Sequence, residues 1–262
     1  MKKILMGLAC AAALCQTAKA VTSDNVFGVL RVDSAAAETI ISVPWIETAA
    51  SNGDIKACDL VLTSNLTEGD RLLYYTGTAA VADSPAQDFR YLGWTLVEED
   101  GVKKWQSVTT VDTDADGRTR LTESAHDGAQ AVPRGAALIV IRPTAHAEPI
   151  YLYGQYVPGT VGVQVAAGSL KEPAYTLLAP SDPNGVDLNK PGVMTGTPDI
   201  NDYIVTGDVG TMLKYSKSRG KWGVMGDFDF EAGDYSFDPT AVIPHGQGVW
   251  YVSRGGAPKF NW

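Results

Sequence analysis

The residues best suited to bind a metal ion lie in one acidic stretch, DTDADGRTRLTE, at positions 112 to 123. The stretch matches D-x-[DN]-x-[DN]-G with a glutamate at loop position 12, which is the sequence pattern of calcium-binding loops. In such loops the side chains at positions 1, 3 and 5, the backbone carbonyl at position 7 and the glutamate supply the oxygen ligands. The pattern therefore predicts a Ca²⁺ site made by Asp112, Asp114, Asp116, Arg118 and Glu123.

The sequence on either side of this stretch predicts a β-hairpin and not the paired helices of an EF-hand. WQSVTTV before the loop is rich in β-branched residues, and TESAHDGAQAVPRG at its end contains turn residues. In a hairpin, Asp127 could replace Glu123 as the closing ligand. The alternative is an acidic turn without a metal, because aspartate-rich turns also keep hairpin tips in solvent.

The chain carries no recognisable catalytic constellation. Its three histidines, His126, His146 and His245, fall in turns or in a linker, and no G-x-S-x-G motif occurs. The carboxylate run of residues 98–100 directly precedes Gly101 and is typical of a turn. We therefore expect a protein that is not an enzyme. A secreted hydrolase is an alternative that these residues favour least.

The N-terminus predicts export. Residues 1–20, MKKILMGLACAAALCQTAKA, combine two lysines, an apolar run and a small-x-small cleavage site, which is the layout of a signal peptide cleaved after Ala20. No later stretch reaches the roughly 18 apolar residues that a spanning helix needs. The expected location is the periplasm, the cell surface or the extracellular space, without a transmembrane segment.

The net charge argues against nucleic acid as a partner, and the cysteine content argues against an internal disulfide. Without the signal peptide the chain has 18 basic and 30 acidic residues, a formal net charge of −12. Such a chain is unsuited to nucleic acid, which proteins bind through clustered lysine and arginine. Cys58 would be the only cysteine of the mature chain. No internal disulfide is then possible, and we expect its thiol to be buried between apolar neighbours.

Short runs rich in Val, Ile, Leu, Thr and Tyr fill the rest of the chain, and they predict an all-β fold. Twenty-seven glycines and fourteen prolines supply the turns. Twelve of these runs have the length of a strand: FGVLRV, ETIISVPW, DLVLTS, RLLYYT, KKWQSVTTV, AALIVIRP, IYLYGQY, AYTLLAP, DYIVTG, MLKYS, KWGVM and QGVWYVS.

Four short patterns recur in the same order in both halves, which predicts tandem copies of one unit. They are a threonine-led strand ending in proline (39–44 and 176–180), a Gly-Asp pair before a strand (69–70 and 207–208), a Lys-Trp pair (104–105 and 221–222) and a Pro-x-Gly turn before a strand (133–142 and 244–254). We expect two related β-sandwich or barrel-like domains, residues 21–145 and 146–262. A single β-sheet protein with recurring turns is the alternative.

Each half carries an insertion, residues 76–101 in the first and 181–202 in the second, and we expect these loops to carry any binding function. Trp105 and Trp222 occupy matched positions and are predicted to lie in the core. Trp45 and Trp94 lie outside the repeated patterns, and they are the candidates for exposed aromatic platforms that could stack on sugars.

The segments PHGQGVWYVSRGG, IYLYGQY and AYTLLAP, with the final Asn-Trp, resemble a set of exported, β-rich bacterial proteins of the cell envelope or surface. The resemblance implies a surface location and transfers no activity and no site residues. We therefore expect a structural or binding protein of the envelope, with envelope components or glycans as partners. A calcium-stabilised glycan-binding or adhesive module is the alternative.

Overall fold

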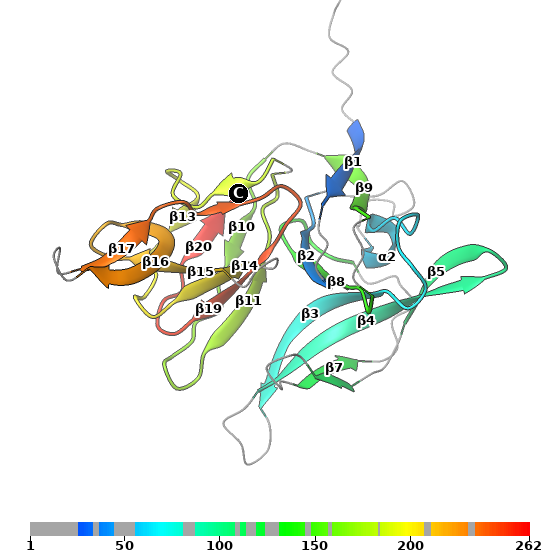
Figure 1. The fold of residues 1–262 in the computed structure, drawn as a ribbon, viewed down its shortest axis with the longest axis horizontal. Coiled ribbons are helices and arrows are strands. Elements are labelled where there is room, and N and C mark those ends of the chain that lie inside the picture. Colours follow the sequence, from blue (N-terminus) through cyan, green and yellow to red (C-terminus); the bar gives the residue numbers. More distant parts are fainter. Residues whose placement is uncertain are drawn as a thin grey trace, which may run out of the picture.

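The computed structural model describes residues 26–33, 37–44, 56–80, 87–107, 111–113, 119–123, 131–144, 148–156, 159–182, 184–206, 211–229 and 234–262. Within these ranges the chain forms twenty strands and one helix, α2 (Ala57–Leu60), so the all-β prediction is confirmed (Figure 1). No described helix is long and apolar enough to cross a membrane. The predicted signal peptide and Trp45 lie outside the described residues.

The first half is built on one large sheet. Its strands follow the order β2 (Glu38–Ser42), β8 (Ala137–Ile141), β3 (Arg71–Ala80), β4 (Gln87–Glu99), β7 (Thr119–Glu123) and β6 (Val111–Thr113), and β5 (Val102–Ser107) also pairs with β4. All pairs are antiparallel except β4 with β7. The predicted insertion is therefore mostly a long β3–β4 hairpin.

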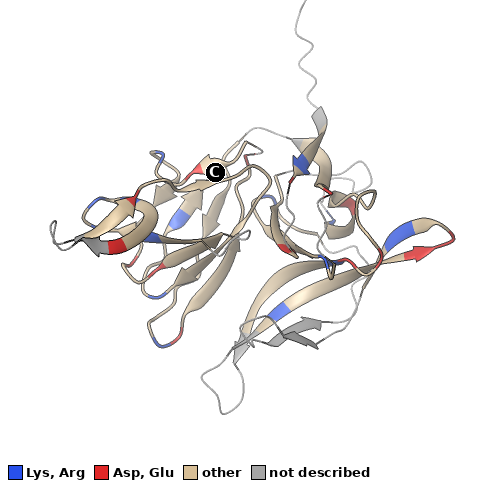
Figure 2. Ribbon diagram, in the orientation of Figure 1, with Lys and Arg blue, Asp and Glu red and all other residues tan. Residues whose placement is uncertain are grey.

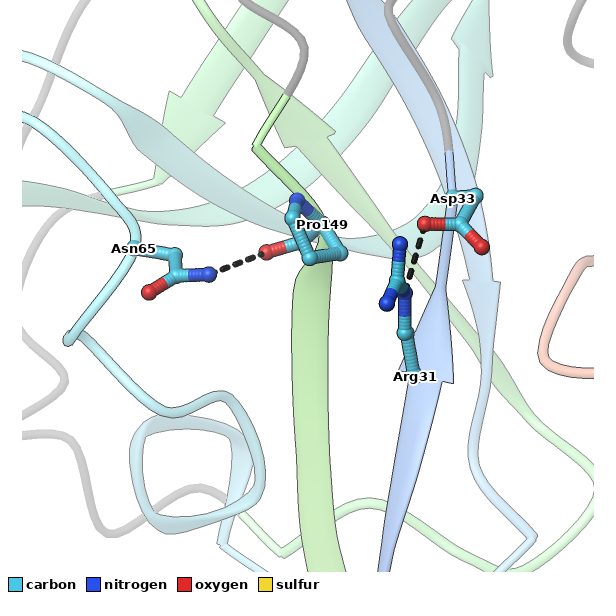
Figure 3. Close-up of polar contacts among 4 residues, drawn as sticks. All are labelled: Arg31, Asp33, Asn65 and Pro149. Atoms are coloured by element: carbon cyan, nitrogen blue, oxygen red, sulfur yellow. Dashed lines mark hydrogen bonds and ion pairs between the residues drawn. The ribbon is translucent and has the colours of Figure 1, made fainter.

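A two-stranded ribbon completes the first half. β1 (Val26–Val32) pairs with β9 (Ile150–Tyr156), and Val32 and Ile150 enter the first core. The amide of Asn65 donates to the carbonyl oxygen of Pro149 at 3.3 Å, and Arg31 pairs with Asp33 on the exposed side (Figure 3). β9 lies beyond the boundary predicted at residue 145, yet its apolar side chains belong to the first core.

The second half has a main sheet of its own. Its main sheet has the order β11 (Ala174–Leu178), β19 (Val249–Ser253), β14 (Tyr203–Thr206), β15 (Met212–Ser216), β16 (Lys221–Asp229) and β17 (Asp234–Asp238). Two small sheets cover it, one of β10 (Gly162–Gln164), β20 (Lys259–Asn261) and β13 (Met194–Thr195), the other of β12 (Val186–Asp187) and β18 (Val242–Ile243).

Alternation along the strands produces three apolar cores. One face of the first sheet buries Leu72, Trp94 and Val140 in the first core, and one face of the second buries residues such as Trp222 and Tyr251 in the second core. The opposite faces form a third core between the halves, which we call the junction core. Its buried members are Ile40, Leu73, Phe89, Tyr91, Ala137, Ile139, Leu177 and Ala179.

Two glycine turns join the halves reciprocally. Gly246, at φ +71°, lies against Val32 of the first half, and Gly135, at φ +85°, lies against Val161 of the second. The backbone amide of Ser42 donates to the carbonyl oxygen of Gly246 at 2.8 Å. A side chain at either glycine would require both a left-handed backbone and space that the other half occupies.

Two predicted features differ from the structure. DLVLTS was expected to be a strand, but residues 57–60 form helix α2 and only Val61 makes an isolated bridge. The insertion 181–202 was expected to be a loop, but it contains two short strands, β12 and β13. Asn189 anchors it to the second half. The side chain of Asn189 donates to the carbonyl oxygens of Trp222 and Pro239 and accepts from the amide of Trp222.

Candidate functional site

The stretch predicted to bind Ca²⁺ joins the antiparallel strands β6 and β7, with Asp112 opposite Arg120. Asp114, Asp116, Arg118 and Asp127 lie outside the described residues, and the side chains of Asp112 and Glu123 are likewise not described. Glu123 is in strand β7, whereas the twelfth residue of an EF-hand loop begins a helix. The hairpin is as expected, and the ligand set stays a prediction.

The acidic run at residues 98–100 is exposed at the tip of the β4–β5 hairpin, where Glu98 and Glu99 end β4 and Asp100 lies in the turn. Asp100 and Gly101 both have positive φ, 53° and 75°, and Glu99 forms an ion pair with Lys104. Figure 2 shows that the charged residues lie mainly at turns and strand ends. Among the described residues, no group of three or more His, Cys, Asp or Glu could hold a metal ion.

A groove of about 370 Å³ lies where the two halves meet. It is lined by residues 74–77 of β3, 136–137 at the start of β8, 164–166 at the end of β10 and 175–177 of β11. Three tyrosines, Tyr74, Tyr75 and Tyr175, give it an aromatic wall, and Gln164 and Thr176 add polar groups. None of the described residues that line it carries a charge, so the groove is aromatic and neutral.

The aromatic wall is held by the junction core. The rings of Tyr75 and Trp250 meet edge to face at 4.9 Å, as do those of Phe89 and Tyr175. Strand β3 bulges between Tyr75 and Gly77, where Gly77 has φ +133°. The bulge shifts the pairing register at the point where β3 lines the groove. Aromatic residues from strands far apart in sequence therefore meet at one site.

Tyr75 contributes a neutral hydroxyl to the groove. Burial raises the pKa of Tyr75, and the nearby Tyr175 raises it further, while a hydrogen bond with Thr78 has the opposite effect. Gln164 donates through Nε2 to the carbonyl oxygens of Ala257 and Pro258, at 2.8 and 3.2 Å. These bonds fix its amide group, so the groove presents a preformed set of hydroxyl and amide groups.

A second recess of about 500 Å³ is lined largely by the insertion of the second half. Its charged lining residues are Asp182, Asp187 and Lys190. Oδ1 of Asp182 accepts from the amide of Asn184, and Oδ1 of Asp187 accepts from the amide of Asn189. Because both aspartates stabilise turns of the loop itself, the aromatic groove is the stronger candidate for a binding site.

The tryptophan predictions were partly wrong. Trp94, expected to be an exposed platform, has no exposed surface, because it shares the inner face of β4 with the buried Leu92 and Leu96. The spacing Leu-x-Trp-x-Leu already carries this signal. Trp222 is buried in the second core, as predicted, whereas Trp105 is only half-buried and packs against the edge of the first core.

Cys58 and His245 are the remaining sequence candidates that lie within the described residues. Cys58 is half-buried against the first core, as expected, and burial raises the pKa of its thiol to about 12. His245 is exposed at the turn before β19, and the other two histidines lie outside the described residues.

Sequence reasoning did not identify the groove. RLLYYT and AYTLLAP were both predicted to be strands, and β3 and β11 confirm this. Their meeting depends on how the two halves pack, which alternation along a single strand does not reveal. Comparisons with protein-family models, with curated proteins and with solved structures find no match to this chain.

Proposed function

We propose that the protein is an exported, non-catalytic binding protein of the bacterial cell envelope and that its ligand is a glycan. The observation that carries the proposal is the groove with Tyr74, Tyr75 and Tyr175. Its volume lies in the range of small-ligand sites, which combine apolar or aromatic walls with a few polar groups. Tyrosine offers both a flat apolar face for a sugar ring and a hydroxyl for hydrogen bonding.

The lining favours binding over hydrolysis. Glycoside hydrolysis requires two carboxyl groups that flank the bond to be cleaved. The described residues that line the groove include neither a carboxylate nor a histidine. A glycan in the groove would therefore be bound through shape, stacking and neutral hydrogen bonds.

We further infer that the two halves are tandem copies of one β unit. The strand order β2-β8-β3-β4 with β5 in the first sheet corresponds to β11-β19-β14-β15-β16 in the second. The registers also correspond: Trp105 lies opposite Leu96, and Trp222 lies opposite Tyr215. On this alignment the seam lies between β9 and β10, after the strand that completes the first core.

A buried aspartate supports the same alignment. Asp70 precedes β3 and accepts from the amide of Thr67 at 2.9 Å, and Asp202 precedes β14 and accepts from the amide of Asp199 at 2.9 Å. Both aspartates have no exposed surface. The strand pairing thus matches Asp70 with Asp202, whereas the sequence patterns matched it with Asp208, which lies outside the described residues.

Filling the groove tests the proposed function. Ala166 lines the groove and is exposed, so Ala166→Trp would occupy the binding space without removing a core contact. Ala167→Trp, one residue further and also exposed, is the matched control outside the lining. We expect a glycan array to identify ligands that the wild type and Ala167→Trp bind and that Ala166→Trp does not. A blank array for the wild type would contradict the proposal.

A calcium-stabilised binding module is the second candidate, and the hairpin β6–β7 that carries the DTDADG loop favours it. An exported protein meets calcium at concentrations that fill even weak sites. On this candidate, millimolar Ca²⁺ raises the melting temperature of the wild type but not that of Asp114→Ala. An equal shift in both proteins, or no shift in either, would exclude the site.

A further inference from the structure

Two cations lie over one aromatic ring on the face of the second sheet that also contributes to the junction core. Nζ of Lys214 is 4.9 Å from the centre of the Tyr203 ring, and Cζ of Arg254 is 5.3 Å from it. Lys214 comes from β15, and Arg254 follows β19. The ring attracts each cation, but it carries no net charge to neutralise them.

No carboxylate of the described residues pairs with either cation. Two carboxylates lie close in the fold, and both are used by other donors. Asp199, beside Gly255, accepts from the amide of Asn201 at 2.9 Å. Asp202 accepts from the backbone amide of Arg254 at 2.6 Å and from the hydroxyl of Tyr251 at 2.8 Å. Nε of Arg254 is buried without a hydrogen-bond partner in the described part of the chain. Burial lowers the pKa of Lys214, and the neighbouring Arg254 lowers it further. The two cations thus repel one another, and neither has an ion-pair partner among the described residues.

This cation pair lies on the same sheet face as a wall of the tyrosine groove. Tyr175, which lines the groove, is opposite Val252, Val252 is opposite Tyr203, and Tyr203 is opposite Lys214. Directly paired residues share a face, and neighbouring strands are about 4.8 Å apart. Tyr203 therefore lies about 10 Å from Tyr175 across the strands.

The geometry points to an acidic glycan as the ligand: its carboxylate or sulfate group binds Lys214 and Arg254, and adjoining sugar rings contact the tyrosine groove. This inference rests on the proposed function and names its ligand class. An anion between the two cations removes their mutual repulsion and gains charge-assisted hydrogen bonds. The neutral groove alone offers no such preference for charge.

The inference is tested by affinity electrophoresis in gels that contain polygalacturonate, dextran sulfate, neutral dextran or polyglutamate. The test variant is Lys214→Gln with Arg254→Gln, because glutamine keeps hydrogen-bonding capacity but removes the charges. The control is Lys217→Gln with Lys221→Gln, which changes the net charge equally at two exposed lysines. Melting temperatures establish that each variant is folded. Ala166→Trp is run in parallel.

We expect polygalacturonate or dextran sulfate to retard the wild type and the control. The affinity of the test variant for the same polymer should be at least about tenfold lower. Whichever polymer binds more tightly identifies the anionic group. Binding should weaken with added salt, because part of it is electrostatic.

Three other results would overturn the inference. If the test variant binds the acidic glycans as the wild type does, while Ala166→Trp does not, the ligand is a glycan recognised without these cations. If polyglutamate binds as tightly as the glycans and depends on the same cations, the ligand is an acidic polypeptide. If no glycan retards the wild type, the proposed function fails together with the inference.

Discussion

At the scale of single residues, the carboxylate of Asp202 shows how much one buried acid can organise. It accepts hydrogen bonds from the amides of Asp199, Arg254 and Gly256 and from the hydroxyl of Tyr251, although it is fully buried. These bonds connect the turn before β14 to the turn after β19. Their donors would have no acceptor without the carboxylate.

Asp202→Ala should therefore lower the free energy of unfolding by about 3 to 5 kcal/mol, since several buried donors lose their partner. Asp238→Ala is the control, because Asp238 is exposed and, within the described part of the chain, accepts hydrogen bonds only from Thr240. That variant should lose much less stability, because water can replace the carboxylate at an exposed turn. Urea unfolding measures both, and equal losses would refute the role given to Asp202.

Cys58 provides a pH-dependent prediction. Its thiol has a pKa of about 12 in the folded protein, mainly through burial, against an ordinary value of 9.0. Between these values the unfolded chain loses the thiol proton while the folded chain keeps it, so stability falls as pH rises from about 9 to 12. Wild type should lose stability more steeply than Cys58→Ala across this window. Parallel curves would show that the thiol is not shielded.

At the scale of elements, short runs of β-branched, apolar and aromatic residues between turn residues allowed most strands to be predicted. Strands β2 and β8 are buried on both faces, so they show no alternation of buried and exposed residues. Helix α2 was missed because Ala57 and Leu60 are the buried positions of a single turn, and DLVLTS also reads as a strand. Trp94 was predicted to be exposed because it lies outside the repeated patterns. Its spacing of two residues from Leu92 and Leu96, which places all three on one face of the strand, was given less weight.

The Pro-x-Gly turn before β19 is an element whose shape depends on the other half. A Cβ at Gly246 would lie 2.5 Å from Cγ2 of Val32, whereas one at Gly192 would meet nothing within 4 Å. Both glycines have positive φ, +71° and +88°. Gly192→Ala should cost about 1 kcal/mol from backbone strain, and Gly246→Ala about 3 kcal/mol, since overpacking adds to the strain. Similar losses by chemical denaturation would contradict the contact between the halves.

At the scale of the whole molecule, the junction core should make the two halves unfold together. Phe89 and Tyr91 of the first half and Leu177 and Ala179 of the second are buried in it, and the Ile41–Gln247 bridge joins the backbones. Scanning calorimetry should show one transition whose calorimetric and van 't Hoff enthalpies agree. Two resolved transitions would mean that the junction core contributes little.

The arrangement of the halves also sets the limit of what the sequence could predict. The strands that carry Tyr75 and Tyr175 were recognisable, and so was their β character. Their packing across the junction core was not, because Tyr75 contacts Trp250 from a position 175 residues away in the chain. The groove is a product of that packing, whereas the acidic loop is a local pattern.

The central claim is that the groove between the halves binds a glycan. Its most direct test is the equilibrium affinity of Ala166→Trp, relative to Ala167→Trp, for a glycan that the wild type binds. We predict that filling the groove weakens binding by at least about tenfold, because the tryptophan occupies the space of a sugar ring. Equal affinities for the two variants would place the binding site elsewhere on the molecule and contradict the claim.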